Sequence, residues 1–518
     1  MTFPKSPQNR LGDIIYQSLN TMEEAIFLLG HWRTHEQFQR WLEEKLLAFL
    51  PTLEGQIRFY ADILEKVYLL NLDRLLPLVM NRYSFTGRPA KNQPEIFRAL
   101  VVMIHLKEGI TSFVERLKAH PLLAAACGFE PDSVPGVGTF YDFLDRFWME
   151  DEPSKVLREP RRKKRRKPKG GEKLPDEDTS YIGGLVNKVL EGYSFEGPET
   201  LLQKILAECA VKPSLDFGLC GEGRKLVFAG DGAPLETGAS PRGKRVCSCK
   251  EQGIYQCSCP RLHTGPTANW GWDSYHERWF YGHTLYPITA AGSANDLPLL
   301  LHLTQASRHD SGTFVVTYAQ LRQVYPELVF ASALLDSAHD AYEIYRLLNA
   351  HGIEPFIDLN KRRGQKQKIS AFEVNDLGKP VCLAGSEMAH YGVDKKRQRI
   401  KWRCPMYRQP NQCPKKQVCS PSAYGRVVYT KPCNDPRLFT KTPRGSKVWK
   451  KSYARRTSVE RTIKRILVDY DIESLRFRAE KRWFWSASLA AINMHLDAQV
   501  AALKQPLFTR LGLIQKAA

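Results

Sequence analysis

The sequence predicts an α/β fold, in which a mixed β-sheet flanked by helices follows an all-helical N-terminal region. Three observations lead to this prediction. Apolar side chains recur at helical spacing over residues 12–150, short apolar runs typical of strands begin near Lys225, and helical stretches then alternate with those runs. Strands that alternate with helices form a sheet with helices on its faces.

The N-terminal region, residues 1–155, is predicted to be helical. Helices are expected over 94–106 and 112–120, and Thr139 is expected to cap a helix that runs to Trp148. Short helices with tight turns are what a helix-turn-helix DNA-binding domain requires, and a plain helical bundle would show the same pattern. The earlier apolar positions at helical spacing are Ile14, Ile15, Leu19, Met22, Ile26, Leu42, Leu46, Phe49 and Leu50.

A basic linker is predicted next, over 156–175. Eight of the nine residues of 161–169 are Lys or Arg. Like charges at this density repel one another and do not pack, so the segment is expected to be an exposed tether that also touches DNA phosphates. A solvated tether with no such contact is the alternative. A helical connector is predicted over 176–225.

The first part of the sheet is predicted within residues 226–400. Helices are expected between its later strands, over 312–324 and 341–350. The remaining parts are a Cys- and Trp-rich extension at 245–280, a Cys-rich basic insertion at 401–450, and C-terminal helices at 451–505. The expected strands are 226–229, 285–288, 299–303, 333–335 and 355–357.

The charge balance points to a polyanion as partner. The chain has 76 Lys and Arg against 55 Asp and Glu, a formal net charge of +21. Neutralising phosphates releases counterions and drives binding, although ribosomal, RNA-binding and membrane-surface proteins carry the same excess. We find no signal-peptide layout and no apolar run long enough to cross a bilayer, so a cytoplasmic protein without a membrane partner is expected. The twelve cysteines are then expected to be core residues or metal ligands.

Three acidic residues are candidates for one catalytic centre. Asp231 and Asp336 each follow an apolar run, at the predicted end of a strand, and Glu460 lies on the border between the apolar and polar faces of a predicted helix. A loop-capping role for each aspartate and a surface ion pair for the glutamate are the alternatives. Carboxylates are the ligands that Mg²⁺ prefers, and two such ions stabilise both oxygens of an in-line phosphoryl transfer.

Several segments resemble, in the right order, the bacterial insertion-sequence transposases of the DDE class, which have a ribonuclease H-like catalytic core. Residues 231–240 are similar to the Asp-Gly-Thr block of that family, and 335–345 are similar to its second aspartate and following helix. Tyr453, Arg456 and Glu460 have the spacing of its Tyr-Arg-Glu signature. The other similar segments are 86–90, 279–286 and 307–311.

The resemblance implies both activity and roles. Asp231, Asp336 and Glu460 would coordinate two Mg²⁺ (or Mn²⁺) ions for cleavage at the ends of an element and for joining to target DNA. Tyr453 and Arg456 would position double-stranded DNA, and the N-terminal helices would bind terminal inverted repeats. A homodimer or higher assembly on DNA, in the bacterial nucleoid, is expected.

The sequence departs from the family pattern at one cation. The signature lysine usually lies seven residues after the glutamate, where this chain has Leu467. Lys464 lies one turn after Glu460 on the same helical face and is the candidate to replace it in contacting DNA.

Cysteines and tryptophans give two further hypotheses. Cys247, Cys249, Cys257 and Cys259 form two Cys-x-Cys arms that would suit structural Zn²⁺, and Cys404, Cys413, Cys419 and Cys433 form a looser second set. Unligated thiols are the alternative for both sets. Trp270 and Trp272 are candidates to stack on an unpaired base, although packing is the commoner reason for a tryptophan cluster.

Two other functions remain open at the level of sequence. A transposase-derived DNA-binding protein that has lost catalysis would keep the N-terminal region and the basic charge. A metal-dependent nuclease on the same fold would cut DNA without joining it. The intact acidic triplet argues against the first, and the order of the motifs favours transposition over the second.

Overall fold

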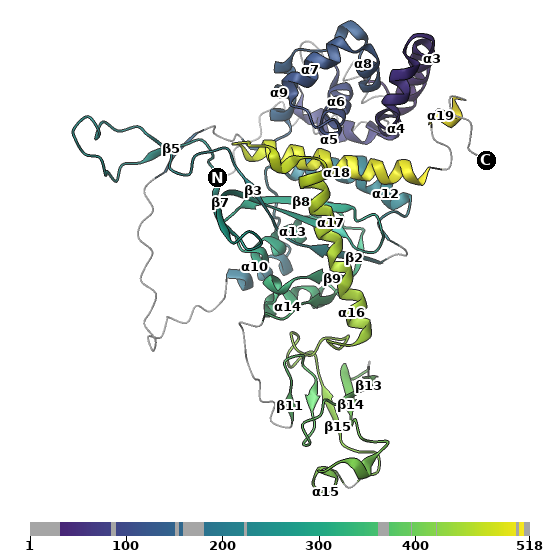
Figure 1. Ribbon diagram of the computed structural model, residues 1–518, viewed down its shortest axis with the longest axis vertical. Coiled ribbons are helices and arrows are strands. Elements are labelled where there is room, and N and C mark those ends of the chain that lie inside the picture. The colour runs from purple at the N-terminus through teal and green to yellow at the C-terminus, as the bar shows by residue number, and fades with distance from the viewer. Residues whose placement is uncertain are drawn as a thin grey trace.

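The computed structural model describes residues 32–83, 90–150, 155–158, 181–221, 225–360, 372–394, 396–420, 422–503 and 507–511. The predicted helix start at residues 14–26, the basic run 161–169 and most of the segment 86–90 lie outside the described residues. Figure 1 shows a helical layer at one end, a sheet in the middle and a small β-rich unit at the other end.

The N-terminal layer is helical, as the apolar spacing predicts. Thr34 opens α3 with a capping box: its hydroxyl accepts a hydrogen bond from the backbone N–H of Gln37, whose side chain in turn accepts from the backbone N–H of Thr34. The helices are α3 (His35–Phe59), α4 (Ala61–Leu69), α5 (Leu76–Val79), α6 (Gln93–His105), α7 (Ile110–Ala119), α8 (Pro121–Cys127) and α9 (Val137–Arg146).

The expected helices at 94–106 and 112–120 are confirmed within two residues at each end, but the expected cap of the last helix is wrong. Helix α9 begins at Val137, so Thr139 lies inside its first turn. Gly136 occupies the cap position in an extended conformation and makes no side-chain hydrogen bond. Glycine is an accepted residue at this position, so the helix starts without the threonine hydroxyl.

A seven-stranded mixed sheet forms the middle layer, and each of the five expected runs lies in one of its strands. The order β10-β9-β2-β7 is parallel between its first three strands and antiparallel between β2 and β7. Strands β3, β6 and β8 all pair with β7 in the antiparallel sense. The strands are β2 (Lys225–Gly230), β3 (Ala233–Glu236), β6 (Asn269–Asp273), β7 (Arg278–Ala290), β8 (Pro298–Gln305), β9 (Val329–Leu335) and β10 (Glu354–Ile357).

Alternation along β2 gives the sheet two apolar faces, because successive side chains of a strand point to opposite sides. Phe228 stacks on Phe314 of α13 (Asp310–Val324), whereas Ala229 belongs to a cluster with Val459 of α17 (Thr457–Lys464). The predicted helices at 312–324 and 341–350 are confirmed as α13 and α14 (Tyr342–Ala350). The predicted connector is helical as well, with α10 (Tyr181–Leu190), α11 (Thr200–Leu206), a π turn (Ala207–Val211) and α12 (Lys212–Asp216).

The C-terminal helical region is interrupted rather than continuous. Helix α16 (Lys447–Tyr453), a 3-10 turn (Ala454–Arg456), α17 and a π turn (Arg465–Asp469) follow one another, and a break that holds only a 3-10 turn (Ile472–Ser474) then separates them from α18 (Glu480–Ala502). Asp471, with a φ of 56°, begins that break. A short α19 (Leu507–Arg510) follows.

Helix α18 lies between the N-terminal helices and the sheet and is buried along most of its length (Figure 1). Trp485 Nε1 donates to the carbonyl of Leu144, and His495 Nε2 lies 2.9 Å from the carbonyl of Pro298 at the start of β8. One apolar core therefore continues from the N-terminal helices into the sheet. None of the described helices combines the length and apolar character needed to span a membrane.

The β-rich unit has a small core of its own. Strands β13 (Ala389–Asp394), β14 (Arg399–Arg403) and β15 (Val427–Thr430) form an antiparallel sheet around Met388, Ile400, Trp402 and Val428. Strands β11 (Glu373–Val374) and β12 (Pro380–Val381) and helix α15 (Lys416–Cys419) complete it. The predicted boundary at residue 400 therefore falls inside β14, the central strand of this sheet.

Candidate active site

The ends of two adjacent parallel strands place two of the candidate carboxylates side by side. Gly230 of β2 pairs with Leu335 of β9, so the next residue on each strand, Asp231 and Asp336, lies at the same edge of the sheet. Both side chains are partly open to solvent, with 22% and 33% of their surface exposed. Substrate can therefore reach them.

Glu460 reaches this edge from α17, and Arg456 joins it to the strand ends. The Arg456 guanidinium donates from Nη1 to Asp231 Oδ2 at 3.2 Å and from Nη2 to Glu460 Oε1 at 2.5 Å. Val459, which lies between Arg456 and Glu460 in the sequence, is fully buried and packs α17 on the sheet. The structure thus brings the strand-end aspartates and the helical glutamate to one site.

The three candidate carboxylates of this site do not lie close enough together to share one metal ion. Among the described residues, no three carboxylates place oxygens within 4.8 Å of one another. Arg456 accounts for the separation, since its guanidinium lies between Asp231 and Glu460. A cation shared by all three would have to replace the guanidinium in neutralising them.

A buried histidine holds Asp336 in place. His339 is fully buried in the turn after β9, with Nδ1 2.6 Å from Asp336 Oδ1 and Nε2 2.7 Å from the Tyr286 hydroxyl. Burial alone would raise the pKa of Asp336, but the hydrogen bond and charge of His339 outweigh it and lower the pKa. Asp336 is therefore held ionised and fixed in orientation.

Asp231 has a different environment. Burial, and then the negative charges of Asp336 and Asp310, raise its pKa to about 6. Asp310 is the first residue of α13, and a Cβ added to Gly232 would lie 2.6 Å from its Oδ1. Only a residue without a side chain leaves room for this carboxylate beside Asp231. The concentration of negative charge favours a bound cation.

The sequence analysis did not predict three residues of this site: Asp310, His339 and Asp358. Asp358 follows β10 as Asp336 follows β9, because Ile357 pairs with Leu335, so a third strand-end aspartate lies at this edge. Asp310 and His339 lie inside the family-like segments 307–311 and 335–345, and this position could have identified them as site residues. Asp358 follows a predicted strand in the same way as the two chosen aspartates.

Of the predicted DNA-contacting residues on the C-terminal helices, Tyr453 lies close to the site and Lys464 points elsewhere. The Tyr453 ring stacks on Trp449 with centroids 4.6 Å apart, and the charges of Asp336 and Asp231 act on its hydroxyl. Lys464 is 68% exposed and lies 4.0 Å from Asp469. Leu467, at the usual position of the signature lysine, is buried in the π turn.

The tryptophan-rich segment forms an exposed aromatic surface on β6 and the start of β7. Trp272 packs edge-on against Trp279, yet the two residues are 52% and 64% exposed. Trp270 leans on Tyr281 and is 39% exposed. Core packing therefore does not account for Trp272 and Trp279, and their faces are open to a ligand.

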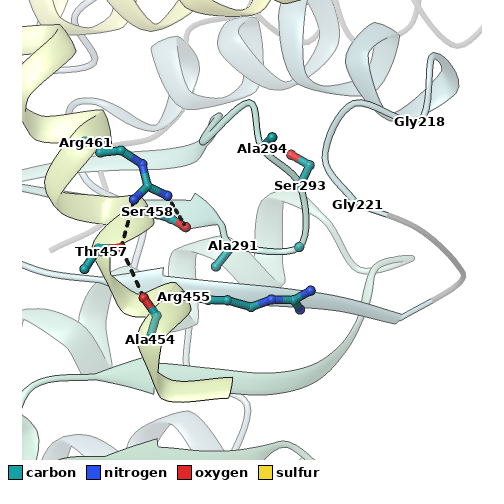
Figure 2. A pocket seen from close by; sticks show the side chains of 11 residues that line it. Gly218, Gly221, Ala291, Ser293, Ala294, Ala454, Arg455, Thr457, Ser458 and Arg461 are labelled. Carbon is teal, nitrogen blue, oxygen red and sulfur yellow. Dashed lines mark hydrogen bonds between the residues drawn. The ribbon is translucent and has the colours of Figure 1, made fainter. Parts of the chain in front are cut away.

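A polar pocket of about 590 Å³ lies beside the start of α17 (Figure 2). Arg455, Thr457, Ser458 and Arg461 line one side, and the turn at residues 291–294 lines the other. The guanidinium of Arg461 is paired with Asp296. None of the three candidate catalytic carboxylates lines this pocket, so it adjoins the site without containing it.

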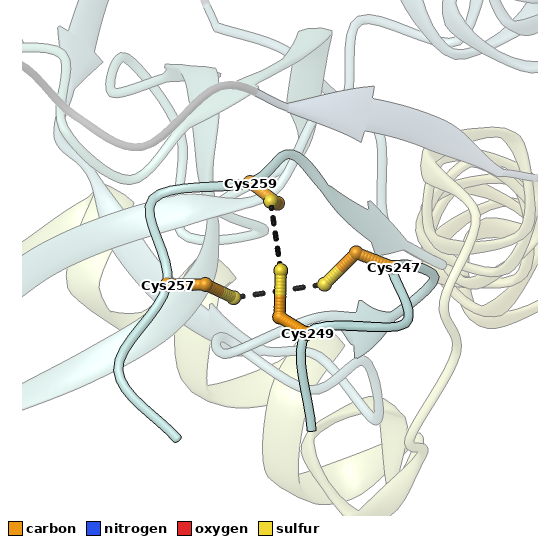
Figure 3. Close-up of side chains that lie close together, drawn as sticks. All are labelled: Cys247, Cys249, Cys257 and Cys259. Atoms are coloured by element: carbon orange, nitrogen blue, oxygen red, sulfur yellow. Dashed lines mark hydrogen bonds between the residues drawn. The ribbon is translucent and has the colours of Figure 1, made fainter. Parts of the chain in front are cut away.

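The two sets of cysteines differ in the structure. The sulfurs of Cys247, Cys249, Cys257 and Cys259 all lie within 4.8 Å of one another (Figure 3). In the second set, Cys404, Cys413 and Cys419 line one small pocket, whereas Cys433 is exposed beside Asn434 and does not line it. The structure therefore gathers the first predicted set and leaves the second incomplete.

Part of the chain matches a known family. Residues 258–494 match the family described as the transposase DDE domain. The matched segment contains Asp336 and Glu460 and begins after Asp231. No curated protein matches the chain.

Proposed function

Residues 258–494 of this protein belong to the transposase DDE domain family, and from that membership we propose that it is a DNA transposase. It would bind the terminal inverted repeats of an insertion sequence and catalyse metal-dependent strand cleavage and strand transfer. The observation that carries the proposal is the meeting of Asp231 and Asp336 at neighbouring strand ends with Glu460, through Arg456. The mixed strand order, with helices on both faces, supports a ribonuclease H-like core.

The donor set suits Mg²⁺ or Mn²⁺, because these ions prefer carboxylate oxygens and leave room for water and phosphate. Asp231, Asp336 and Glu460 would hold two metal ions, which supply activation of the attacking oxygen and stabilisation of the leaving one. His339 keeps Asp336 ionised and oriented for this task. Arg456, once released from the carboxylates, would be free to pair with a DNA phosphate.

Cations and exposed aromatic rings around the site support a path for DNA. Tyr453 and Arg456 would contact the strand being cut, whereas Lys464, which points away from the carboxylates, and Arg455 in the adjoining pocket would meet the DNA backbone beside it. Trp270 and Trp272 would stack on bases displaced near the cleavage point, since aromatic faces accept any base. The N-terminal helices would provide recognition of the repeats, on a homodimer or larger assembly.

The proposal is tested with purified protein, Mg²⁺ or Mn²⁺, and labelled DNA made from the repeats that flank its gene. Asp231→Asn, Asp336→Asn and Glu460→Gln are each expected to lose cleavage and joining by at least about a thousandfold while end binding persists. Glu327→Gln is the matched control, because Glu327 precedes β9 at the end of the strand opposite Asp336. It should keep full activity.

Each other outcome points to a different function. Cleavage without joining would favour a metal-dependent nuclease. Specific end binding by folded protein with no chemistry in either metal would favour a DNA-binding descendant that no longer catalyses. Activity that survives in Asp336→Asn would overturn the assignment of the carboxylates.

A further inference from the structure

An arm at residues 240–263 projects to one side of the sheet, near the label β5 in Figure 1. It begins just after β3 and contains β4 (Lys244–Arg245) and β5 (Arg261–His263), and β5 pairs with β4 on one side and with β1 (Val156–Arg158) on the other. The two Cys-x-Cys turns lie at its centre. None of the candidate catalytic residues belongs to the arm.

The arm lacks an apolar core that would fix its shape. Its large apolar side chains between the two Cys-x-Cys turns and beside them, Val246, Ile254 and Tyr255, are 54%, 48% and 69% exposed. The backbone hydrogen bonds between the two Cys-x-Cys turns are local, such as that from the backbone N–H of Ile254 to the carbonyl of Cys249. Segments too small to bury apolar surface are usually held by a disulfide or a metal ion.

The four thiols have the geometry of a metal centre rather than of disulfides. Cys247 Sγ lies 3.6 Å from Cys257 Sγ, and Cys249 Sγ lies 3.5 Å from Cys259 Sγ. A disulfide requires about 2.0 Å. Tetrahedral Zn²⁺ with bonds of about 2.3 Å spaces its sulfurs about 3.8 Å apart, close to both distances.

We infer that Cys247, Cys249, Cys257 and Cys259 bind one structural Zn²⁺ ion, which holds the arm in shape. Figure 3 shows the four side chains converging on one point from the two turns. With all four ligands supplied by the protein, the centre has no open position for substrate, as expected of a structural site. His263 lies outside the group and packs against Gly243.

The cysteine centre lies next to the aromatic surface of β6 and β7. Cys257 and Cys259 line a pocket of about 260 Å³ together with Arg242, Arg261 and Trp270. The metal would therefore fix two arginines relative to a tryptophan proposed to contact DNA. This consequence rests on the proposed function, whereas the metal site itself does not.

Metal analysis of the full-length protein tests the inference. Protein made in zinc-containing medium and purified under reducing conditions without chelators should carry Zn²⁺, and Cys249→Ser/Cys259→Ser should carry one equivalent less. Ser248→Ala/Ser258→Ala is the matched control, because it alters the same two turns and spares every thiol. It should keep the wild-type zinc content, while unchanged zinc in the cysteine variant would overturn the inference.

Two measurements on wild-type protein keep the test valid if the cysteine variant fails to fold. Co²⁺ exchanged into the site should give the sulfur-to-metal charge-transfer and intense visible bands of a tetrahedral tetrathiolate centre. Alkylation followed by peptide mapping should find all four cysteines protected until a chelator is added. Protein that contains no zinc, or in which these cysteines are paired as disulfides under reducing conditions, would contradict the site.

Discussion

Among individual residues, the neighbouring aspartates of the candidate site illustrate how environment decides protonation. Asp336 has a histidine partner, which lowers its pKa, and Asp231 has mainly burial and two carboxylates, which raise its pKa to about 6. Arg456 responds to the same charges: burial would lower its pKa, but Glu460, Tyr453 and Asp231 raise it. In the absence of metal, this guanidinium supplies part of the positive charge that the site requires.

Metal binding should therefore depend on pH through Asp231. Because a metal ion binds the ionised carboxylate, below pH about 6 it must displace a proton, and its affinity should fall by up to about tenfold per pH unit. Mn²⁺ titration of DNA-free protein by electron paramagnetic resonance from roughly one pH unit below that value to roughly one and a half units above it measures this.

The contribution of Asp231 to folding stability changes with pH in the opposite direction to the metal affinity. Since the folded pKa of Asp231 exceeds its ordinary value of 3.8, its contribution to the metal-free fold is present below that value and lost as pH rises through about 6. Asp231→Asn should remove the pH dependence of Mn²⁺ binding along with most of the affinity. A wild-type affinity that does not change across pH 6 would contradict the assigned environment.

For single elements, the position of Glu460 depends on how α17 is anchored. Thr462 is fully buried and its hydroxyl donates to the carbonyl of Asp296 at 2.7 Å. Thr462→Val should lower the free energy of unfolding by about 1–3 kcal/mol, because a buried acceptor loses its partner, and should slow cleavage as Glu460 shifts. Urea denaturation and the cleavage assay measure the two effects.

Thr457 on the same helix provides the comparison. Its hydroxyl bonds to the carbonyl of Ala454 at an exposed position, so Thr457→Val should change stability by no more than about 0.5 kcal/mol. Equal losses in the two variants would show that the bond to Asp296 is not what anchors the helix.

The elements were predictable from sequence where the signal is local. Short apolar runs predict all five expected strands, and an aspartate follows three of these runs within two residues: Asp231, Asp336 and Asp358. The pairing of distant charges was not predictable: Arg437, in the segment after β15, forms two 2.8 Å bonds to the buried Asp340, 97 residues away, and so ties that segment to the turn after β9. The π turn that buries Leu467 has no signal in hydrophobic spacing.

At the scale of the whole molecule, the excess of positive charge matches the proposed substrate, DNA, which is a polyanion. With a formal net charge of +21, affinity for DNA ends should fall steeply with salt, with a slope of about −0.9 per phosphate contacted in a log–log plot. Binding measured by fluorescence anisotropy at several salt concentrations gives the slope. The same series with DNA of unrelated sequence separates the phosphate contribution, and a flat profile for both would contradict an electrostatic mode of binding.

The burial of α18 between two layers has a consequence for the time course of synthesis. The indole of Trp485 bonds to the carbonyl of Leu144, which precedes it by 341 residues. A ribosome that adds about 5–20 residues per second needs roughly 20–70 s to cover that distance. During that interval the N-terminal helices have been synthesised but α18, which covers them, has not. The sheet lacks the same helix. The chain completes its interior almost last.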